Sequence, residues 1–336
     1  MDQIYTSCAN MDQTFIEVCA GCGGLSTGLI QAGFKPLMLN EMDKNCCMTL
    51  RANHPDVKVI QGNMCDIDVL EYKNKCDLLV GGIPCQSYSM AGKRKGLQDE
   101  KRGGLMLEFK RLIDDINPKV FMIENVKGLL FHDNGNTLNI ILQHLNPDGR
   151  YNIRYKVINA GYYEVPQKRE RIFIVAIRAD IQKIFKFPKP IEDKIYLRDI
   201  LVDVPESECA KYTGRKLEIM KMIPEGGCWI NLPLDIQKEY LGGAFNSGGG
   251  KRGMARRLSM NEQCLTLTTS PAQKQTERCH PIETRPLSIR EYARIQTFDD
   301  EFILCGSMLQ KYKQIGNAVP VKLAYHIGRR LKKVLK

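Results

Sequence analysis

The chain has 336 residues, a length typical of about two domains that each bury their own core, so a small disulfide-stapled scaffold is excluded. Its 49 lysines and arginines outnumber its 38 aspartates and glutamates, and the resulting formal charge of +11 favours a polyanionic partner. No uninterrupted apolar stretch approaches the ~18 residues of a membrane span. Because the first residues carry no secretion signal, we expect a cytoplasmic protein whose 13 cysteines are mostly reduced.

Short apolar runs alternate with helical patterns between Thr14 and about Arg178. This alternation predicts a mostly parallel α/β sheet with right-handed crossovers, and a functional site at the carboxyl ends of its strands. Two of the predicted helices end near Gly33 and His54. The predicted strands cover residues 14–18, 35–40, 57–60, 77–82, 120–125 and 171–177.

The pattern changes in the second half of the chain. From about Ile181 to Ile282, glycine and proline become frequent and no strand–helix alternation can be followed, which indicates a second domain. A helical pattern returns over residues 288–298. Residues 319–335 then form an amphipathic pattern with a basic end, which predicts a last helix.

A glycine-rich turn follows the first predicted strand. Gly21, Gly23, Gly24 and Gly28 lack Cβ atoms where the strand passes into a helix, so a ligand can approach the backbone there. Glu41 stands 20 residues after Gly21 at the end of the second strand, where a carboxylate can accept both hydroxyls of an adenosine ribose. A structural turn is the alternative for the glycines alone, but the combination favours a nucleoside-containing cofactor.

Two cysteines lie in this turn. Cys19 and Cys22 form a CxxC, the spacing found in redox and zinc motifs. The chain contains no second CxxC. We therefore interpret both cysteines as small residues of a tight turn, and we expect no metal site.

A further cysteine stands on the loop after the fourth predicted strand, at the carboxyl edge of the sheet. Pro84 precedes Cys85, and Lys93, Arg94 and Lys95 supply positive charge that favours a thiolate. This placement predicts a nucleophile. The general alternative for a lone cysteine is a small buried hydrophobe.

A carboxylate and two arginines complete the candidate site. Glu124 ends the strand over residues 120–125 at the same edge, and therefore near Cys85. The alternative for Glu124 is a solvated helix start. Arg169 and Arg171 stand at the beginning of the last predicted strand, where the two-residue period of a strand places both on one face. Both side chains are expected to point into the same pocket.

Together these residues resemble the DNA (cytosine-5)-methyltransferase family, of the bacterial or viral restriction–modification type. The resemblance covers most of the chain outside about residues 181–280, and its motifs occur in the family's order, which makes the combination specific. Beside the glycine turn, the matching motifs are NEMD (40–43), PCQSYS (84–89), ENV (124–126), QKRER (167–171), RPLSIREYARIQTF (285–298) and YKQIGNAVP (312–320).

The resemblance implies a fold and a domain organisation. The fold is that of a class I S-adenosylmethionine-dependent methyltransferase, Rossmann-like with a mostly parallel sheet, joined to a smaller target-recognition domain. The GNAVP motif implies that the C-terminal helix packs back onto the first domain. Residues 1–180 and 305–336 would then form a discontinuous catalytic and cofactor-binding domain, and residues 181–304 the target-recognition domain with its hinge.

The resemblance also implies a mechanism. Cys85 adds to C6 of a flipped-out cytosine and makes C5 nucleophilic toward the methyl group of S-adenosylmethionine. Glu124, with a raised pKa, holds the N3 proton and binds the exocyclic amine. Arg169 and Arg171 meet the base O2 and a backbone phosphate.

The implied cofactor contacts come from both ends of the chain, and two of them depart from the family pattern. Cys19 replaces an aromatic residue and so removes a stacking face for adenine. Asn63 replaces an aspartate, but its amide can still accept a hydrogen bond from the adenine amine, so we expect binding to survive. The implied cofactor residues are Cys19, Gly21, Cys22, Gly24, Glu41, Met42, Asn63, Met64, Gly82, Pro84, Leu105, Asn317 and Val319.

Double-stranded DNA is the implied partner of a monomeric enzyme, and a restriction endonuclease would be a functional partner only. The segment 181–304 carries the basic run KRGMARR and a Thr-Leu pair that the family keeps before its recognition elements. A solvated basic face is the alternative, and the recognised sequence does not follow from these residues. The implied DNA contacts are Gln86, Ser89, Lys93, Arg94, Lys95, Arg252, Arg256, Arg257 and Thr266.

Three alternatives stay open at this point. A tRNA cytosine-5 methyltransferase of the same fold fits the charge and Cys85, although its branch carries a Cys-Phe-Thr element that CLTLTT (264–269) does not reproduce. A catalytically silent DNA-binding module would be expected to lack Cys85 or Glu124, and both are present. A nicotinamide dehydrogenase fits the glycine turn alone and leaves Pro84, Cys85 and the arginines unexplained.

Overall fold

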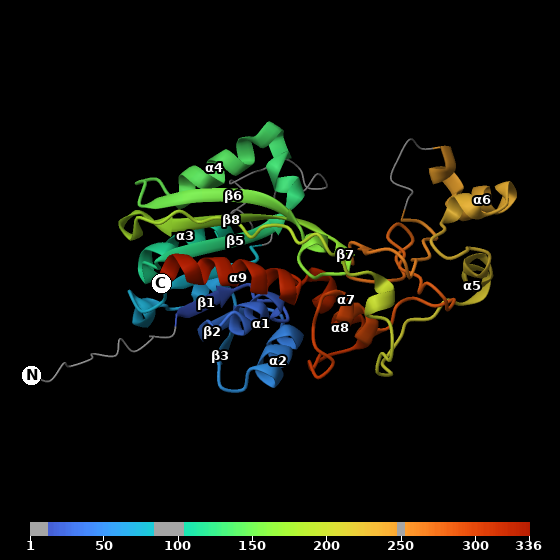
Figure 1. The fold of residues 1–336 in the computed structure, drawn as a ribbon, viewed down its shortest axis with the longest axis horizontal. Helices are drawn as coiled ribbons and strands as arrows, with labels where there is room; N and C mark the ends of the chain where they lie inside the picture. The colour runs from blue at the N-terminus through green and yellow to red at the C-terminus, as the bar shows by residue number, and fades with distance from the viewer. Residues whose placement is uncertain (1–12, 84–103, 247–252) are drawn as a thin grey trace, which may run out of the picture.

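The structure is a computed structural model that describes residues 13–83, 104–246 and 253–336. A seven-stranded sheet with the order β3-β2-β1-β4-β5-β8-β6 forms its centre (Figure 1). Strands β1 to β5 run parallel, and each predicted strand has a counterpart whose ends agree within one residue. The strands are β1 (Thr14–Val18), β2 (Lys35–Glu41), β3 (Lys58–Gln61), β4 (Leu78–Gly81), β5 (Val120–Val126), β6 (Tyr151–Asn159) and β8 (Glu170–Arg178).

The prediction of a mostly parallel sheet is confirmed, but two features of the sheet were not predicted. No direction was assigned to β8, which runs antiparallel to both β5 and β6. β6 was not predicted at all, because it is an edge strand with Arg154 and Lys156 at exposed positions and so lacks an apolar run. The apolar pattern therefore located the buried strands, but it contained no information on strand direction.

Helices cover both faces of the sheet. α1 and α9 pack against the face that carries Phe15 and Leu39, and α3 and α4 pack against the face that carries Ile16 and Phe121. The alternation of side chains along a strand separates the two cores. The helices are α1 (Gly24–Gln31), α2 (Lys44–Asn53), α3 (Gly104–Ile116), α4 (Asn136–Leu145) and α9 (Val321–Leu335).

The last helix lies against the first one (Figure 1). A Cβ atom on Gly28 would lie 2.4 Å from the carbonyl oxygen of Val321 and 2.5 Å from the Cβ of Ala324. The close approach of α1 and α9 therefore requires a residue without a side chain at position 28. The C-terminal helix thus shares a core with the N-terminal half of the chain, while the domain boundaries at residues 180 and 305 stay predictions.

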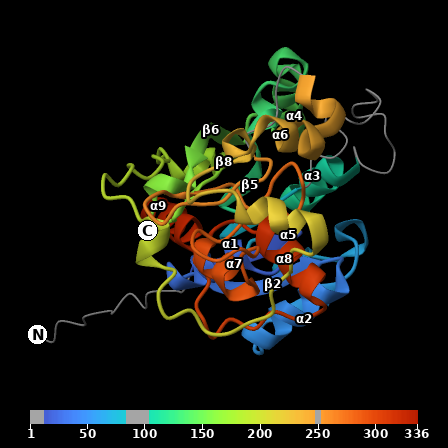
Figure 2. The ribbon, with the colours of Figure 1, turned by 90° about the vertical axis from the view of Figure 1, so that its right-hand side faces the viewer.

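The chain between β8 and α8 forms short helices and loops (Figure 1 and Figure 2) that pack around two smaller cores. One core gathers Tyr212, Met220 and Met254 beside α5 and α6. The other contains Tyr292 of α7 and joins this segment to Ile315 of α8 and to Cys22 of the glycine turn. The elements are α5 (Gly214–Lys221), α6 (Leu234–Leu241), α7 (Ile289–Ile295), α8 (Met308–Asn317) and the parallel pair β7 (Gln167–Lys168) and β9 (Cys264–Leu265).

Short 3-10 helices make many of the connections. Among the described ranges, no helix combines the length and the apolar character needed to cross a membrane. The 3-10 helices cover Met64–Asp66, Leu70–Tyr72, Lys127–Leu130, His132–Gly135, Ala160–Tyr162, Ala179–Ile181, Leu197–Asp199, Trp229–Asn231 and Gly242–Asn246.

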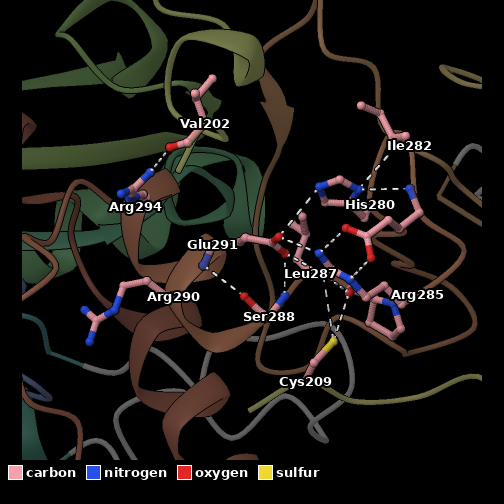
Figure 3. A network of polar contacts seen from close by, with 12 residues as sticks. Val202, Cys209, His280, Ile282, Arg285, Leu287, Ser288, Arg290, Glu291 and Arg294 are labelled. Carbon is pink, nitrogen blue, oxygen red and sulfur yellow. Dashed lines mark hydrogen bonds and ion pairs between the residues drawn. The ribbon is translucent and has the colours of Figure 1, made fainter. Parts of the chain in front are cut away.

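A network of polar contacts holds α7 in place (Figure 3). We call four of its residues the α7 junction: Arg285, Ser288, Glu291 and Arg294. Arg285 donates from two nitrogens to both carboxylate oxygens of Glu291, each at 2.8 Å. The N–H of Ser288 donates to the same carboxylate at 2.6 Å as part of a capping box. Arg294 donates to Asp300 at 2.6 Å. The charged residues of the RPLSIREYARIQTF motif therefore build the fold.

Candidate active site

A cavity of about 730 Å³ opens at the carboxyl ends of the parallel strands. Parallel α/β sheets bind ligands at this edge, and the volume is within the ~300–1,000 Å³ of small-molecule sites. α8 contributes Gln310, Lys313, Gln314 and Asn317, which helical spacing places on one face. Residues from both ends of the chain therefore line a single cavity.

The glycine turn and Glu41 form one wall of this cavity. Gly21 has a φ of 56°, and its N–H donates to Glu41 Oε2 at 2.8 Å. Glu41 Oε1 accepts hydrogen bonds from the backbone N–H groups of the next two residues, each at 2.8 Å. A Cβ atom on Gly24 would lie 2.3 Å from the carbonyl oxygen of Val319, so glycine at this position lets the C-terminal segment reach the wall. The carboxylate is thereby held at the sheet edge, where it faces the cavity.

Two sulfur-containing side chains line the same wall. Cys19 Sγ lies 3.7 Å from Met64 Sδ. Burial, together with the nearby charge of Glu41, raises the pKa of the Cys19 thiol to about 12. Cys22 does not line the cavity, because its thiol is buried and donates to the carbonyl oxygen of Gln314 at 3.4 Å. Burial raises the pKa of Cys22 to about 12 as well, so both thiols stay protonated and behave as small apolar groups.

Most of the remaining residues predicted to bind the cofactor also lie at the cavity. Asn63 faces it and accepts a hydrogen bond from the N–H of Cys65 at 3.2 Å, which caps the following 3-10 helix. Pro84 lies outside the described residues. The predicted cofactor residues that line the cavity are Cys19, Gly21, Gly24, Glu41, Met42, Asn63, Met64, Gly82, Leu105, Asn317 and Val319.

A buried carboxyl group lies at the β5 end of the cavity. Glu124 is 9% exposed, and its Oε1 lies 3.1 Å from Arg171 Nε in an ion pair that lacks hydrogen-bond alignment. Burial raises the pKa of Glu124, and the positive charges of Arg171 and Arg169 oppose this shift only in part. A carboxyl group with a raised pKa can hold a proton closer to neutral pH, which is the requirement for a general acid.

Arg169 is buried beside this carboxyl group. It is 1% exposed and donates to the carbonyl oxygens of Leu267 at 3.2 Å and Asn317 at 3.4 Å. Burial and the charge of Arg171 lower the pKa of Arg169 to about 9. Its two contacts connect the cavity to the β9 region and to the C-terminal segment.

The direction of β8 brings the two arginines to the cavity. In the antiparallel register Arg171 pairs with Val126, so the beginning of β8 meets the end of β5. A parallel β8 would place its first residues at the opposite edge of the sheet. Arg169, Arg171 and Glu124 all line the cavity, so the antiparallel strand β8 completes the site.

A family model described as C-5 cytosine-specific DNA methylase matches residues 13–333 of this chain. The chain belongs to this family. It is 50% identical over 333 residues to the type II methyltransferase M.Eco47II of Escherichia coli, which covers 96% of this chain and 80% of the relative. It is 49% identical over 329 residues to M.Sau96I of Staphylococcus aureus, with 96% and 76% covered.

Solved structures share the fold of this methylase. A protein encoded within an E. coli prophage has a TM-score of 0.72 at 24% identity, with 96% of the methylase and 99% of that chain covered. The Entamoeba histolytica methyltransferase EhMeth has a TM-score of 0.71 at 16% identity, with 97% and 99% covered. The predicted class I S-adenosylmethionine-dependent methyltransferase fold is confirmed, and a separate smaller domain stays a prediction.

One of the predicted DNA contacts of the methylase is buried. Arg257 is 4% exposed and donates to the carbonyl oxygens of Ile223 at 2.7 Å and Met220 at 2.8 Å, among others. Its guanidinium therefore holds the protein interior together, contrary to the expectation of a DNA contact. The side chain of the adjacent Arg256 is 18% exposed and lies 3.3 Å from Glu262. The basic run could not distinguish the two, because neighbouring residues of an extended segment point to opposite sides.

The other predicted DNA contacts fall into two groups. Thr266 directly follows β9, and its Oγ1 donates to the carbonyl oxygen of Lys168 at 2.7 Å, one residue from Arg169. The rest of this set, and the predicted nucleophile, are not among the residues that the structure describes. These are Cys85, Gln86, Ser89, Lys93, Arg94, Lys95 and Arg252.

The residues that line the cavity of the methylase without having been predicted include Glu17, Gln310, Lys313 and Gln314. Glu17 interrupts the apolar run TFIEV, and an acidic residue inside a buried strand is a signal that could have revealed it. The other three share the helical period of Asn317, so extending the motif by one and two turns would have found them. In the described part of the chain, no group of three or more histidine, cysteine, aspartate or glutamate side chains could hold a metal ion.

Proposed function

We propose that this methylase transfers a methyl group from S-adenosylmethionine to C5 of a cytosine within a short, specific sequence of double-stranded DNA. The observation that carries the proposal is the shared cavity, in which Glu41 and the glycine turn lie at one end and Glu124 with two arginines at the other. One cavity can thus hold a nucleoside-containing cofactor beside a base. The type II names of the relatives support a role in restriction–modification.

The residues fit S-adenosylmethionine as the cofactor. The volume of about 730 Å³ is ample for it, and the Glu41 carboxylate faces the cavity with lone pairs left for ribose hydroxyls. Glu17 Oε2 and Gln310 Oε1 are buried at the cavity without a hydrogen-bond partner among the described residues, as expected where a polar ligand belongs. When bound, this cofactor supplies an electrophilic methyl group.

The chemistry begins with the nucleophile. The Cys85 thiolate adds to C6 of cytosine, and the electron pair of the 5,6 double bond becomes available at C5, which takes the methyl group. A base then removes the C5 proton, the double bond reforms and the thiolate leaves. Cys85 lies outside the described residues, so this step rests on the resemblance and on the position of Cys85 after β4.

Glu124 prepares the ring for this addition. Because its pKa is raised, the carboxyl group can donate a proton to N3 while its other oxygen accepts from the exocyclic amine. Protonation at N3 withdraws electrons from C6 and favours thiolate attack. Thymine lacks the exocyclic amine, so the same contact selects cytosine.

Arg171 and Arg169 support the same end of the cavity. Arg171 lies beside Glu124 and keeps the pKa of the carboxyl group lower than burial alone would make it. We assign the two guanidinium groups to the base O2 and a nearby phosphate. The buried position of Arg169 suits an uncharged base oxygen, and the less buried Arg171 suits a phosphate.

DNA must be deformed for this reaction. The target carbon of a stacked base cannot reach a cavity at the sheet edge, so the cytosine is flipped out at a cost of a few kcal/mol. We assign target recognition to residues 181–304 with Arg256 and Thr266 as contacts. We further propose that the enzyme acts as a monomer in the cytoplasm, with a cognate endonuclease as a functional partner only.

The decisive experiment compares the wild type with Cys85→Ser in a host that lacks cytosine methylation. Host DNA is sequenced after chemical conversion of unmodified cytosine. We expect one short methylated motif with the wild type and none with the variant. Methylation of tRNA in the same cells without DNA methylation would overturn the DNA assignment, and methylation by Cys85→Ser would remove Cys85 from the mechanism.

A further inference from the structure

We propose that the outer face of α9 is a second DNA-binding surface, which holds the phosphate backbone of duplex DNA without reading its sequence. The inference goes beyond the proposed function, because this face lies outside the cavity and takes no part in methyl transfer. It gives a role to the basic residues of the C-terminal pattern, which the candidate active site does not use.

Basic side chains follow one another along the exposed side of α9. The apolar residues Leu323, Ile327 and Leu331 are buried in the core that this helix shares with α1. Residues spaced alternately by four and three positions lie on one face of a helix. We call the basic residues with this spacing on the exposed side, which end at the position after the helix, the α9 stripe: Lys322, His326, Arg329, Lys333 and Lys336. At 1.5 Å per residue the stripe is roughly 21 Å long.

Most of the positive charge of the stripe has no counterion among the described residues. Neither α9 nor the segment 181–190 contains an aspartate or a glutamate. In the described ranges, the stripe makes a single ion pair, from His326 to Glu164 at 2.6 Å. Exposed cations elsewhere are often paired, as Lys58 is with Glu71 at 2.8 Å. The lysines and the arginine of the stripe are therefore available to an external anion.

Tyr325 orders two of these cations. Its hydroxyl accepts a hydrogen bond from Arg329 at 2.8 Å. Its ring centroid lies 5.8 Å from Lys322 Nζ and 5.7 Å from the guanidinium carbon of Arg329. Contacts with a neutral ring hold a cation in position without cancelling its charge. Less side-chain freedom is then lost when a phosphate binds.

A neighbouring segment widens the basic surface. Arg330 Nε donates to the carbonyl oxygen of Lys186 at 2.9 Å, and Phe185 is buried in the core shared by α1 and α9. These contacts hold the segment against α9. Its side chains Lys183, Lys186 and Lys189 are exposed, so the surface is wider than one helix.

The stripe runs from the cavity toward the opposite edge of the sheet (Figure 1). Val319 lines the cavity, and Lys322 follows it in the first turn of α9. Near the other end of the helix, Lys332 Nζ donates to the carbonyl oxygen of Gly33, which precedes β2 at the amino ends of the parallel strands. A duplex lying along the stripe would contact it over roughly six base pairs, given ~3.4 Å per base pair. The stripe is thus placed to contact DNA outside the sequence that occupies the cavity.

The chemistry of this surface favours a phosphate backbone. Lysine and arginine bind phosphates through charge and hydrogen bonds, and such contacts carry no sequence information. A helix that binds a membrane inserts an apolar face into the lipid, but the apolar face of α9 is buried against α1. DNA is the polyanion on which the methylase family acts, and its phosphates match the charge of the stripe.

The test measures binding of a random-sequence duplex of about 30 base pairs at several salt concentrations, without cofactor. The stripe variant combines Lys322→Gln, Arg329→Gln and Lys333→Gln, which remove three charges and keep good helix formers. The matched control combines Lys73→Gln, Lys75→Gln and Arg154→Gln, which remove the same charges from exposed side chains elsewhere on the molecule.

We expect the stripe variant to bind this duplex about tenfold more weakly than the wild type at low salt. The dependence of the logarithm of the association constant on the logarithm of the salt concentration should fall by about two to three units of slope, because each phosphate contact contributes about 0.9. The control should keep the wild-type slope. Single-turnover methylation at saturating DNA should stay within about twofold of the wild type in both variants, because neither changes the cavity.

The other outcomes are equally defined. An unchanged affinity and slope in the stripe variant overturn the inference, and so do equal losses in the two triple variants, which would reflect net charge alone. Weaker binding of tRNA with unchanged binding of duplex DNA overturns the choice of partner. If the stripe variant does not fold, Lys322→Gln and Lys333→Gln should each lower the slope by about one unit, and an unchanged slope in both overturns the inference. A wild type that binds the duplex but methylates no cytosine contradicts the proposed function, while the binding comparison still decides on the stripe.

Discussion

Buried polar groups of the cavity and the arginines around α7 differ in what they contact. In the cavity, Glu17 Oε2, Arg169 Nε and Gln310 Oε1 have no hydrogen-bond partner among the described residues. In the α7 junction, Arg285 and Arg294 are each paired with a carboxylate, and Arg257 nearby donates to several carbonyl oxygens. The arginines that donate to these carboxylates and carbonyl oxygens stabilise the fold, whereas the cavity atoms without a hydrogen-bond partner are available to ligands. Charge alone would not separate the two groups.

The substitution with the largest expected effect on this contrast is Glu124→Gln. The amide cannot donate the proton that we assign to N3, so we expect single-turnover methylation to fall by about 10²–10⁴-fold while the protein stays folded. Wild-type turnover should also decline as pH rises through the raised pKa of Glu124, because the carboxyl group then loses its proton. A variant within about tenfold of the wild type would remove Glu124 from the chemistry.

Removing a buried arginine that donates several hydrogen bonds should lower stability instead. Arg257→Met removes the buried guanidinium that donates to the carbonyl oxygens of Ile223 and Met220, so we expect the free energy of unfolding to fall by about 3 kcal/mol. Urea denaturation measures the change. The matched control is Arg256→Met, whose more exposed side chain should cost less than about 1 kcal/mol. Equal losses in the two variants would show that burial does not distinguish the two arginines.

The buried carboxyl group of Glu17 should make stability depend on pH when no cofactor is bound. The folded protein keeps the proton of Glu17 up to about pH 8, and the unfolded chain loses it above about pH 4.5, so the contribution of this group to stability falls between these values. Glu17→Gln lacks this loss. Thermal denaturation should therefore find the variant more stable than the wild type by on the order of 2 kcal/mol near pH 8 and similar to it near pH 5. A constant difference across this range would contradict the buried, protonated state.

The smallest expected effect concerns Arg256. If it contacts one phosphate, Arg256→Ala should weaken DNA binding a few-fold and reduce the salt dependence of the association constant by about one unit of slope. The measurement is a titration of short duplex DNA at several salt concentrations. An unchanged slope would mean that Arg256 serves only its pair with Glu262.

Much of the sheet could be predicted from local patterns in the sequence, whereas about half of the cavity-lining residues could be predicted, most of them from the resemblance to the family. Apolar runs marked the buried strands, and Glu41 could be placed at the cavity since it ends such a run. The direction of β8 depends on contacts between distant segments, which an apolar pattern does not contain. β6 is largely exposed and resembles a polar loop in sequence.

Single side chains were harder to predict than strands. Arg256 and Arg257 are adjacent and chemically identical, and only the fold determines that one of them is buried. Glu17 was not predicted as a cavity residue, because it lies inside an apolar strand and interrupts the apolar pattern by which the strand was recognised. Periodicity therefore locates elements, and the partners of individual polar atoms require the three-dimensional structure.

The meeting of α1 with the C-terminal segment has a consequence for how the protein is made. Gly24 packs against the carbonyl oxygen of Val319. The Cys22 thiol donates a hydrogen bond to the carbonyl oxygen of Gln314, which follows 292 positions later in the chain. During synthesis the glycine turn leaves the ribosome long before these partners exist. The nascent chain therefore cannot complete the cavity at the sheet edge until nearly all of it has been translated.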